Sequence, residues 1–246
     1  MSKTIDIARL ELMADMLHGY LRTDVRYGGT FLPRPFLIEF TGSPDSGKTT
    51  CIKELYKFLK RRGLRVHIPQ EGAEVIGHIP RTTPEYNIRT ALYALEMVID
   101  YTHGHAYDVV IFDRSIFDPY AWMMYWQDKG LLSGEERELI QQFFLLRFWV
   151  DRIIASYVVV CEPEEAMRRG QRIALSDKLG ETSNPASIRK LVDRYRTMHE
   201  ELSPKYPQIQ LIDTTTMTES EMVNHIATDT LERLVAEARK MRQHTE

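Results

Sequence analysis

Residues 42–50 place the strongest constraint on how this chain can fold. They read Gly-Ser-Pro-Asp-Ser-Gly-Lys-Thr-Thr and fit G-x-x-x-x-G-K-[ST], the phosphate-binding loop or Walker A pattern. An apolar run at 36–40 precedes the loop and a helical pattern follows it, so the strand–loop–helix context of the motif is present. The segment therefore predicts that a nucleoside triphosphate binds at the junction of a strand and a helix.

Each residue type in this loop has a physical role. The glycines let the backbone curl so that successive N–H groups point at an anion, and the helix that starts at Gly47 adds its positive dipole end. Lys48 supplies a point charge for the β- and γ-phosphates. Thr49 offers a hydroxyl to a phosphate-bound Mg²⁺. The predicted nucleotide-binding residues of the loop are Gly42, Asp45, Ser46, Gly47, Lys48, Thr49 and Thr50.

Strand and helix patterns alternate along the rest of the chain. Strands are predicted at 36–41, 65–70, 108–112, 156–161 and 210–213. Helices are predicted at 48–62, 85–103, 117–129 and 133–151, then from 163, at 185–202 and from 218. This alternation is typical of a three-layer α/β fold, in which helices cover both faces of a parallel sheet and ligands bind at the carboxyl ends of the strands.

The first 35 residues precede this pattern. Ile5, Ala8, Leu12 and Met16 form one stripe of a helix over residues 4–22, and a connector with glycine and proline breakers follows. We therefore divide the chain into an N-terminal helix with its connector, residues 1–35, and a phosphate-binding domain, residues 36–246. The helix packs either on that domain or on a partner.

A second motif, Asp113-Arg114-Ser115, follows a continuously apolar strand. An acid at the end of such a strand is placed to coordinate Mg²⁺, directly or through water, so Thr49 and Asp113 are the predicted metal ligands. Arg114 can clamp a phosphate or a sugar hydroxyl. The competing interpretation is a helix-capping acid beside a solvated arginine, and the phosphate-binding loop upstream favours the functional one.

Glu71 follows the strand predicted at 65–70. From this place its carboxylate can face the transferred phosphoryl group and take a proton from an attacking hydroxyl as a general base. An acid of a surface loop is the competing interpretation, and it applies more strongly to Glu74.

Arginines gather on the helix that follows Pro163. Arg168 and Arg172 share one helical face, and Arg169 lies between them in sequence. Mobile positive charge of this kind can neutralise the γ-phosphoryl oxygens in a transition state. We therefore predict a lid at about 164–184, with Arg168 and Arg172 as its catalytic residues. A solvated basic face is the alternative.

Aromatic residues are dense between 117 and 126. They could stack on a base, but aromatic residues at helical spacing more often belong to a core. We assign most of them to the core and leave Tyr120 and Trp122 open as pocket residues.

Composition narrows the class of protein. The formal net charge is −3, from 32 basic and 35 acidic residues, which argues against a dedicated nucleic-acid binder. No run is long and apolar enough for a membrane span. Cys51 and Cys161 lie in apolar patterns and are predicted to be buried thiols. We expect a cytoplasmic protein.

Together these motifs resemble the P-loop nucleoside and nucleotide kinases, which include deoxynucleoside, thymidylate and nicotinamide riboside kinases. The resemblance covers roughly residues 36–235 and rests on the phosphate-binding loop, Glu71, the Asp113 triplet, the arginine lid and the strand at 210–213. It implies a five-stranded parallel sheet in the order 2-3-1-4-5 for this sequence. It also places Thr214 near the adenine and implies a homodimer, which is common in the group.

Two positions depart from the thymidylate kinase pattern. Asp45 is offset by one position from the aspartate of that loop. Gln70 stands where those kinases have an arginine that helps to hold an acceptor phosphate. The second departure weakens the interpretation in which a nucleotide is the acceptor.

The predicted function is transfer of the γ-phosphoryl group of ATP, bound with Mg²⁺, to a small acceptor, a nucleoside hydroxyl. In it, Glu71 is the base, and Lys48, Arg168 and Arg172 stabilise charge. The alternative acceptor is a nucleoside monophosphate or a modified base within DNA. An alternative of a different class is a regulatory nucleotide-binding module or a slow NTPase, in which the N-terminal helix binds a partner.

Overall fold

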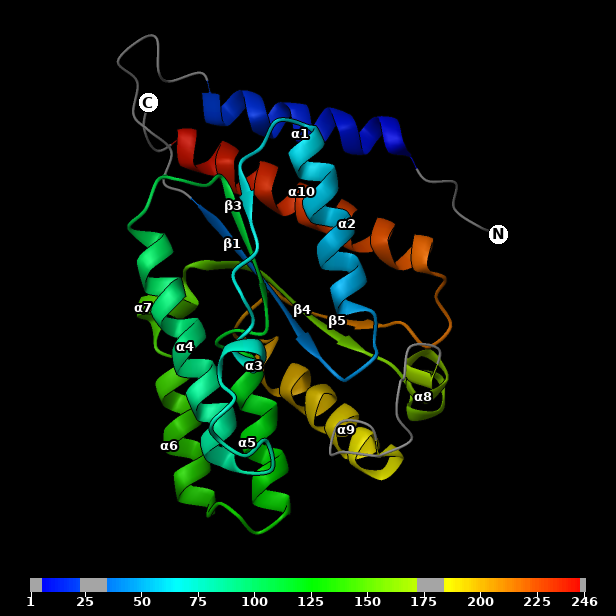
Figure 1. Ribbon diagram of the computed structural model, residues 1–246. Helices are drawn as coiled ribbons and strands as arrows, with labels where there is room; N and C mark the ends of the chain where they lie inside the picture. The colour runs from blue at the N-terminus through cyan, green and yellow to red at the C-terminus, as the bar shows by residue number, and fades with distance from the viewer. Residues whose placement is uncertain (1–5, 23–34, 172–183, 244–246) are drawn as a thin grey trace.

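A parallel sheet forms the centre of the molecule (Figure 1). The computed structural model describes residues 6–22, 35–171 and 184–243. Within these ranges five strands pair in the order β2-β3-β1-β4-β5, and every pair is parallel. The strands are β1 (Phe36–Gly42), β2 (Val66–His67), β3 (Val109–Asp113), β4 (Ile153–Val160) and β5 (Ile209–Asp213). The predicted α/β fold and strand order are confirmed.

Helices cover both faces of the sheet, as the alternation predicted. One face carries α1 (Ile7–Arg22), α2 (Lys48–Arg61) and α10 (Glu219–Gln243). The other carries α4 (Pro84–Thr102), α5 (Asp118–Asp128), α6 (Gly134–Phe144) and α9 (Pro185–Leu202). The shorter helices of the described ranges are α3 (Gly72–Val75), α7 (Arg147–Val150) and α8 (Pro163–Gln171).

The side chains of β1 separate two hydrophobic cores. Phe36, Ile38 and Phe40 belong to the core under α1, α2 and α10, whereas Leu37 belongs to the core under α4, α5 and α9. Because side chains alternate across a strand, Glu39 shares the face of Leu37. Glu39 is fully buried there, so its carboxylate needs partners within that core.

Three element boundaries differ from the sequence predictions. Strand β2 has two residues where 65–70 is predicted, because Pro69 lacks an N–H for the ladder and the chain leaves the sheet edge. The segment between the strand predicted at 65–70 and the helix predicted at 85–103 contains α3. The helix predicted at 133–151 is broken into α6 and α7, because Leu146 has extended backbone angles and the Trp149 indole donates to the Phe144 carbonyl at 2.9 Å.

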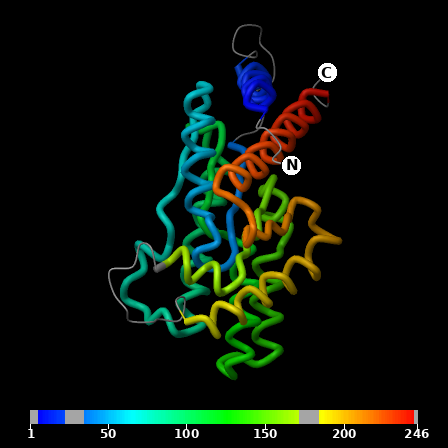
Figure 2. The backbone as a smooth tube through the Cα atoms, turned by 90° about the vertical axis from the view of Figure 1, so that its right-hand side faces the viewer, coloured from blue at the N-terminus to red at the C-terminus, as the bar shows by residue number. Residues whose placement is uncertain are grey.

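The N-terminal helix α1 packs on the domain. Figures 1 and 2 show it alongside α10. Arg62, which follows α2, donates to Asp15 of α1 at 3.0 Å. Arg22, at the end of α1, pairs with Asp108 at 2.9 Å. The side chains that α1 buries in the shared core are Leu10, Ala14, Leu17 and Leu21.

Two further sequence predictions can be compared with the structure. Cys51 and Cys161 are buried free thiols, which confirms their assignment. None of the helices in the described ranges combines the length and the apolar character that crossing a membrane requires.

Candidate active site

A cavity of about 610 Å³ opens at the carboxyl ends of three neighbouring strands. Its lining comes from the phosphate-binding loop after β1, from the segment after β2 and from the end of β3, with α4 and α5 opposite. Six predicted site residues meet in this one cavity: Asp45, Lys48, Thr49, Glu71, Asp113 and Arg114. Four others, Gly42, Ser46, Gly47 and Thr50, shape the loop and the start of α2 without lining the cavity.

The two glycines of the loop have positive φ angles, and Gly42 also lies against the backbone of β4. Gly42 has φ +129°, and a Cβ atom there would lie 1.9 Å from the Val159 carbonyl oxygen. Gly47 has φ +98°, and a Cβ atom there would meet the Met222 sulfur of α10 at 2.6 Å. The Val159 backbone leaves no room for a side chain at Gly42, and the positive φ angle disfavours one at Gly47, so the curl of the loop depends on both glycines.

Lys48 lies inside the loop. Its Nζ donates to the carbonyl oxygens of Ser43 at 2.6 Å and Gly42 at 3.3 Å. Burial lowers the pKa of Lys48 to about 8, and the nearby Arg114 guanidinium acts in the same direction. The ammonium group is therefore a buried charge held at the place where the loop is built to receive an anion.

Thr49 and Asp113 lie next to each other, although 64 residues separate them in sequence. The Thr49 hydroxyl donates to Asp113 Oδ2 at 3.3 Å. Mg²⁺ prefers oxygen ligands and is commonly held by one or two carboxylates together with substrate phosphates and water. A hydroxyl and a carboxylate beside a phosphate-binding loop fit that ion.

Glu71 and Arg114 lie next to each other on the wall of the cavity. Arg114 Nε lies 3.4 Å from Glu71 Oε1, and both side chains are about a quarter exposed. Burial raises the pKa of Glu71, against the opposing effect of the Arg114 charge. A carboxylate with raised proton affinity in a cleft is suited to accept a proton from a hydroxyl.

Arg114 has an unusual backbone. Its φ is +64°, which is uncommon for a residue with a side chain. The Arg114 N–H donates to the Phe40 carbonyl at 2.7 Å, and Nη1 donates to Asp118 at 2.7 Å and to the Tyr195 hydroxyl at 2.9 Å. The surrounding contacts therefore stabilise a conformation that the backbone alone disfavours.

Glu39 holds the turn that carries Arg114. Its carboxylate accepts the backbone N–H groups of Ser115 at 2.9 Å, Phe117 at 3.2 Å and Asp118 at 3.3 Å. Burial, together with the charge of Asp118, raises the pKa of Glu39 to about 8. Glu39 is not among the site residues predicted from the sequence, although an acid within the apolar run 36–40 signals a buried polar contact.

Arg168 and Arg169, both on α8, make different contacts. The Arg168 side chain is 55% exposed and pairs with Glu165. Arg169 instead donates to the Thr214 carbonyl at 2.8 Å and to the Ser46 carbonyl of the phosphate-binding loop at 3.4 Å. Arg172 and residues 172–183 of the predicted lid lie outside the described residues.

Thr214 supports the loop from behind. It is fully buried, and its hydroxyl donates to the Ser46 carbonyl at 2.8 Å. The sequence analysis connected Thr214 with the adenine; the contacts seen here are to the loop and to Arg169.

Some aromatic side chains of α5 lie in the hydrophobic core, and one lines the cavity. Tyr125 and Trp126 are buried in the core, as predicted, and the Trp126 indole donates to Asn87 of α4 at 2.8 Å. Trp122 lines the cavity together with Asn87 and Tyr86. Tyr120 donates to Glu201 at 2.7 Å and does not line the cavity.

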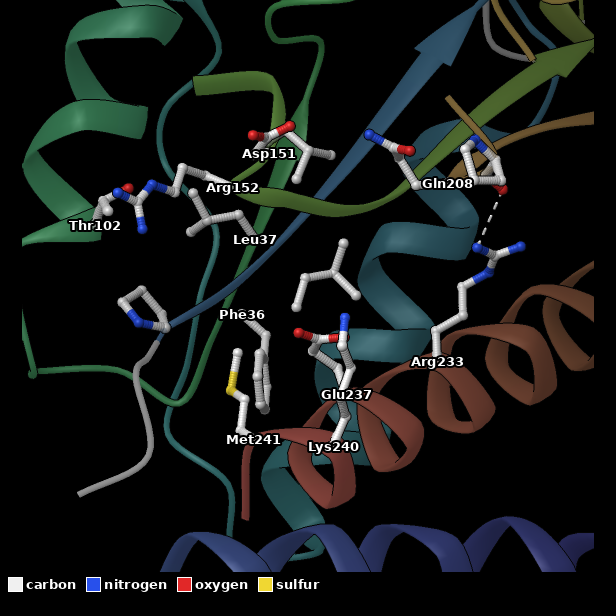
Figure 3. A pocket seen from close by; sticks show the side chains of 14 residues that line it. Phe36, Leu37, Thr102, Asp151, Arg152, Gln208, Arg233, Glu237, Lys240 and Met241 are labelled. Atoms are coloured by element: carbon white, nitrogen blue, oxygen red, sulfur yellow. Dashed lines mark hydrogen bonds and ion pairs between the residues drawn. The ribbon is translucent and has the colours of Figure 1, made fainter. Parts of the chain in front are cut away.

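A second cavity, of about 470 Å³, lies at the opposite end of the sheet, at the starts of β1 and β4 (Figure 3). Phe36, Leu37 and Ile153 contribute apolar surface to it, and Arg233 of α10 donates to the Pro207 carbonyl at 3.4 Å at its edge. None of the predicted site residues lines it.

This chain resembles known proteins in its fold. No protein-family model matches the chain, and no curated protein matches it. The structure of deoxyadenosine kinase from M. mycoides with the products dCMP and a flexible dCDP matches with a TM-score of 0.57 and 13% identity, over 80% of this chain and 98% of that one. The same enzyme with bound dATP matches with a TM-score of 0.56 and 14% identity, over 80% and 99% of the two chains.

Thymidylate kinase from Candida albicans matches with a TM-score of 0.51 and 13% identity, over 82% of this chain and 94% of that one. The strand order, the phosphate-binding loop and these neighbours agree with one another. The chain has the fold of the P-loop nucleoside and nucleotide kinases.

Proposed function

We propose that this protein is a kinase that transfers the γ-phosphoryl group of ATP, in the presence of Mg²⁺, to a hydroxyl of a nucleoside. The observation that carries the proposal is the single cavity in which Lys48 and Thr49 lie opposite Glu71 and Arg114. A nucleotide sensor or slow NTPase requires the first pair. The second pair, Glu71 after β2 and Arg114 after β3, is what a second substrate requires.

The donor half of the cavity binds the triphosphate. Lys48 and the backbone N–H groups of the loop hold its phosphates, and Thr49 with Asp113 would hold the metal ion. The ion, when bound, supplies positive charge to the phosphate oxygens. Arg169 keeps the loop in place through its bond to Ser46, and Arg168 and Arg172 remain proposed charge stabilisers.

The acceptor half positions the attacking hydroxyl. Glu71 accepts the proton, and Arg114 orients the acceptor beside it. Tyr86 and Trp122 provide flat aromatic surface on the opposite wall, which suits a planar base. The deoxyadenosine kinase and thymidylate kinase neighbours support an acceptor of this chemical class.

Purified protein with ATP and Mg²⁺ and a panel of nucleosides, nucleoside monophosphates and nicotinamide riboside tests the proposal. We expect ADP formation above the acceptor-free rate with at least one nucleoside. If every acceptor leaves the ADP rate at the acceptor-free value, the proposal fails for those acceptors and the sensor or NTPase alternative is favoured.

Replacing Glu71→Gln separates the two kinds of acceptor. A hydroxyl acceptor needs a base, so kcat should fall by about 10²–10⁴-fold. A phosphate acceptor is already ionised and needs no base, so phosphoryl transfer to it should persist in Glu71→Gln. Glu74→Gln is the matched control, because Glu74 is exposed and does not line the cavity.

We also propose a homodimer through the outer face of α4, α6 and α7. Large apolar side chains are exposed on these helices, with Leu139 at 71% and Phe148 at 70%. Light scattering of the wild type should give twice the chain mass, and Phe148→Glu should give the monomer. Ile7→Glu, at an exposed apolar site on α1, should leave the dimer unchanged. A monomeric wild type would contradict the proposal.

A further inference from the structure

Arg114, Asp118 and Tyr195 form a closed hydrogen-bonded triangle at the wall of the cavity. Arg114 Nη1 donates to Asp118 Oδ1 at 2.7 Å and to the Tyr195 hydroxyl at 2.9 Å. The Tyr195 hydroxyl donates to the same Asp118 oxygen at 2.7 Å. Tyr195 is on α9 and fully buried, and Asp118 is 6% exposed at the start of α5. The triangle therefore attaches the guanidinium of Arg114 to two helices.

Backbone and side chain of Arg114 are held by separate contacts. Glu39 fixes the turn after β3 through backbone N–H groups and does not touch the guanidinium. Asp118 and Tyr195 hold only the side chain. Thr41 adds a hydroxyl donor to the same Asp118 oxygen. Removing the triangle would thus release the guanidinium while leaving the turn in place.

The triangle also limits how Arg114 meets Glu71. A free arginine next to a carboxylate commonly forms a bidentate pair of two short hydrogen bonds. Here the contact is a long one, at 3.4 Å between Nε and Oε1, and the two hydrogen bonds of Nη1 hold the guanidinium at that position. The Glu71 carboxylate is therefore left available to a hydroxyl in the cavity instead of being neutralised by a full ion pair.

We propose that Asp118 and Tyr195 are positioning residues that hold the guanidinium of Arg114 away from a bidentate pair with Glu71. The kinetic part of this inference rests on the proposed kinase function; the geometric part, the restraint of Arg114, does not.

The chain offers a closely matched control for the tyrosine. Tyr157 is also fully buried, and its hydroxyl is also bonded to an aspartate and a threonine, Asp229 and Thr230, at 2.8 Å each. Tyr157 belongs to the other core, under α10. Tyr157→Phe and Tyr195→Phe therefore remove comparable buried hydroxyls, and the second alone disturbs Arg114.

The kinetic test compares these two variants with an acceptor that the wild type uses. Tyr195→Phe should lower kcat about tenfold, the size expected for losing one hydrogen bond to a charged group, with the KM for ATP unchanged. Tyr157→Phe should keep kcat within about twofold. Equal kcat values in the two variants, or a change in the KM for ATP alone, would overturn the positioning role.

A second test needs no enzymatic activity. The full chain is treated with phenylglyoxal, and modification of Arg114 is measured by peptide mass spectrometry, with the exposed Arg189 as the internal reference. Labelling of Arg114 relative to Arg189 should rise severalfold in Tyr195→Phe and in Asp118→Asn, and should match the wild type in Tyr157→Phe. Unchanged labelling in both Tyr195→Phe and Asp118→Asn would overturn the inference, whatever the wild type does with ATP. If Arg114 labelling rises in these two variants but the wild type transfers no phosphoryl group to any acceptor, the proposed function is rejected and the restraint of Arg114 is supported.

Discussion

Strand β3 has an aspartate beside arginine at each of its ends. Asp108, just before the strand, is fully buried and pairs with Arg22 and Arg65, each at 2.9 Å. Asp113, at the end of the strand, lines the cavity and accepts a longer hydrogen bond, at 3.3 Å, from the Thr49 hydroxyl. Of these two aspartates, the one at the amino end of the sheet is closely paired with arginine, and the one at the carboxyl end faces the cavity.

The proton affinities of the acids follow the same division. At the amino end, burial alone would raise the pKa of Asp108, but hydrogen bonds from Arg65 and the charges of Arg22 and Arg65 hold it below its usual value. At the carboxyl end, burial raises the pKa of Glu71, and Arg114 only partly offsets it. The contacts of Asp108 stabilise its charged form and with it the fold, whereas the surroundings of Glu71 favour proton uptake by its carboxylate.

The two cavities differ in the same way. In the cavity at the amino ends, Arg233 pairs with Asp229 at 2.6 Å (Figure 3 shows Arg233 at its edge). In the cavity at the carboxyl ends, Lys48 is bonded to neutral carbonyl and hydroxyl oxygens. A buried ammonium group without a close carboxylate is ready to bind an anionic ligand. Variants at the two ends should therefore separate function from stability.

Among Lys48→Ala, Arg169→Ala and Asp108→Asn, the largest effect is expected from Lys48→Ala. Loss of the buried charge that faces the phosphates should lower the transfer rate by about 10²–10³-fold, measured as initial rates of ADP formation. Lys53→Ala is the control, because Lys53 is exposed on the same helix. A Lys48→Ala rate within about threefold of the wild type would remove the functional distinction between the two ends of the sheet.

A smaller effect is expected from Arg169→Ala. This change removes the hydrogen bonds that brace Ser46 and Thr214, so nucleotide should bind about tenfold more weakly, as measured by calorimetry. Arg168→Ala should leave affinity unchanged, because Arg168 pairs at the surface with Glu165. If Arg168→Ala weakened nucleotide binding and Arg169→Ala did not, Arg168 would be shown to contact the nucleotide.

The smallest effect on transfer is expected from Asp108→Asn, at the amino end. Activity should be unchanged, and the free energy of unfolding at pH 7 should fall by about 1–3 kcal/mol, because a buried charge-assisted network is broken.

The pH dependence of this variant has a definite sign. The pKa of Asp108 is lower in the folded state, so the stability it contributes is complete above its unfolded pKa of about 3.9 and is lost as pH falls through the folded value. In urea unfolding, the difference between wild type and Asp108→Asn should be constant from about pH 6 to 8 and should shrink below about pH 4. A difference that grew on acidification would contradict the assigned sign.

Residues that act through local spacing could be predicted from the sequence. The loop residues 42–50 are contiguous, and the two glycines have the positive φ angles that the pattern requires. Glu71 and Asp113 follow strands, and the carboxyl ends of neighbouring parallel strands meet at one edge, so their convergence follows from the strand pattern. Domain boundaries and the roles of the site residues remain predictions.

Residues that act through contacts between distant elements could not be predicted. Helical spacing shows that Arg168 and Arg169 point differently, but which of them meets the loop depends on how α8 packs. That packing is close: a Cβ atom on Gly170 would lie 2.8 Å from Asp45. Tyr195 has the spacing of a core residue, and its bond to Asp118 spans 77 positions in sequence.

By itself, the sequence therefore determined the α/β fold class, the phosphate-binding loop and the acids at the strand ends, because these follow from short-range patterns and from the geometry of parallel strands. Only the tertiary structure decided which arginine braces the loop, which buried groups hold Arg114, and which aromatic side chains face the cavity. These depend on the packing of helices that are far apart in sequence, and local periodicity carries no information on which faces will meet.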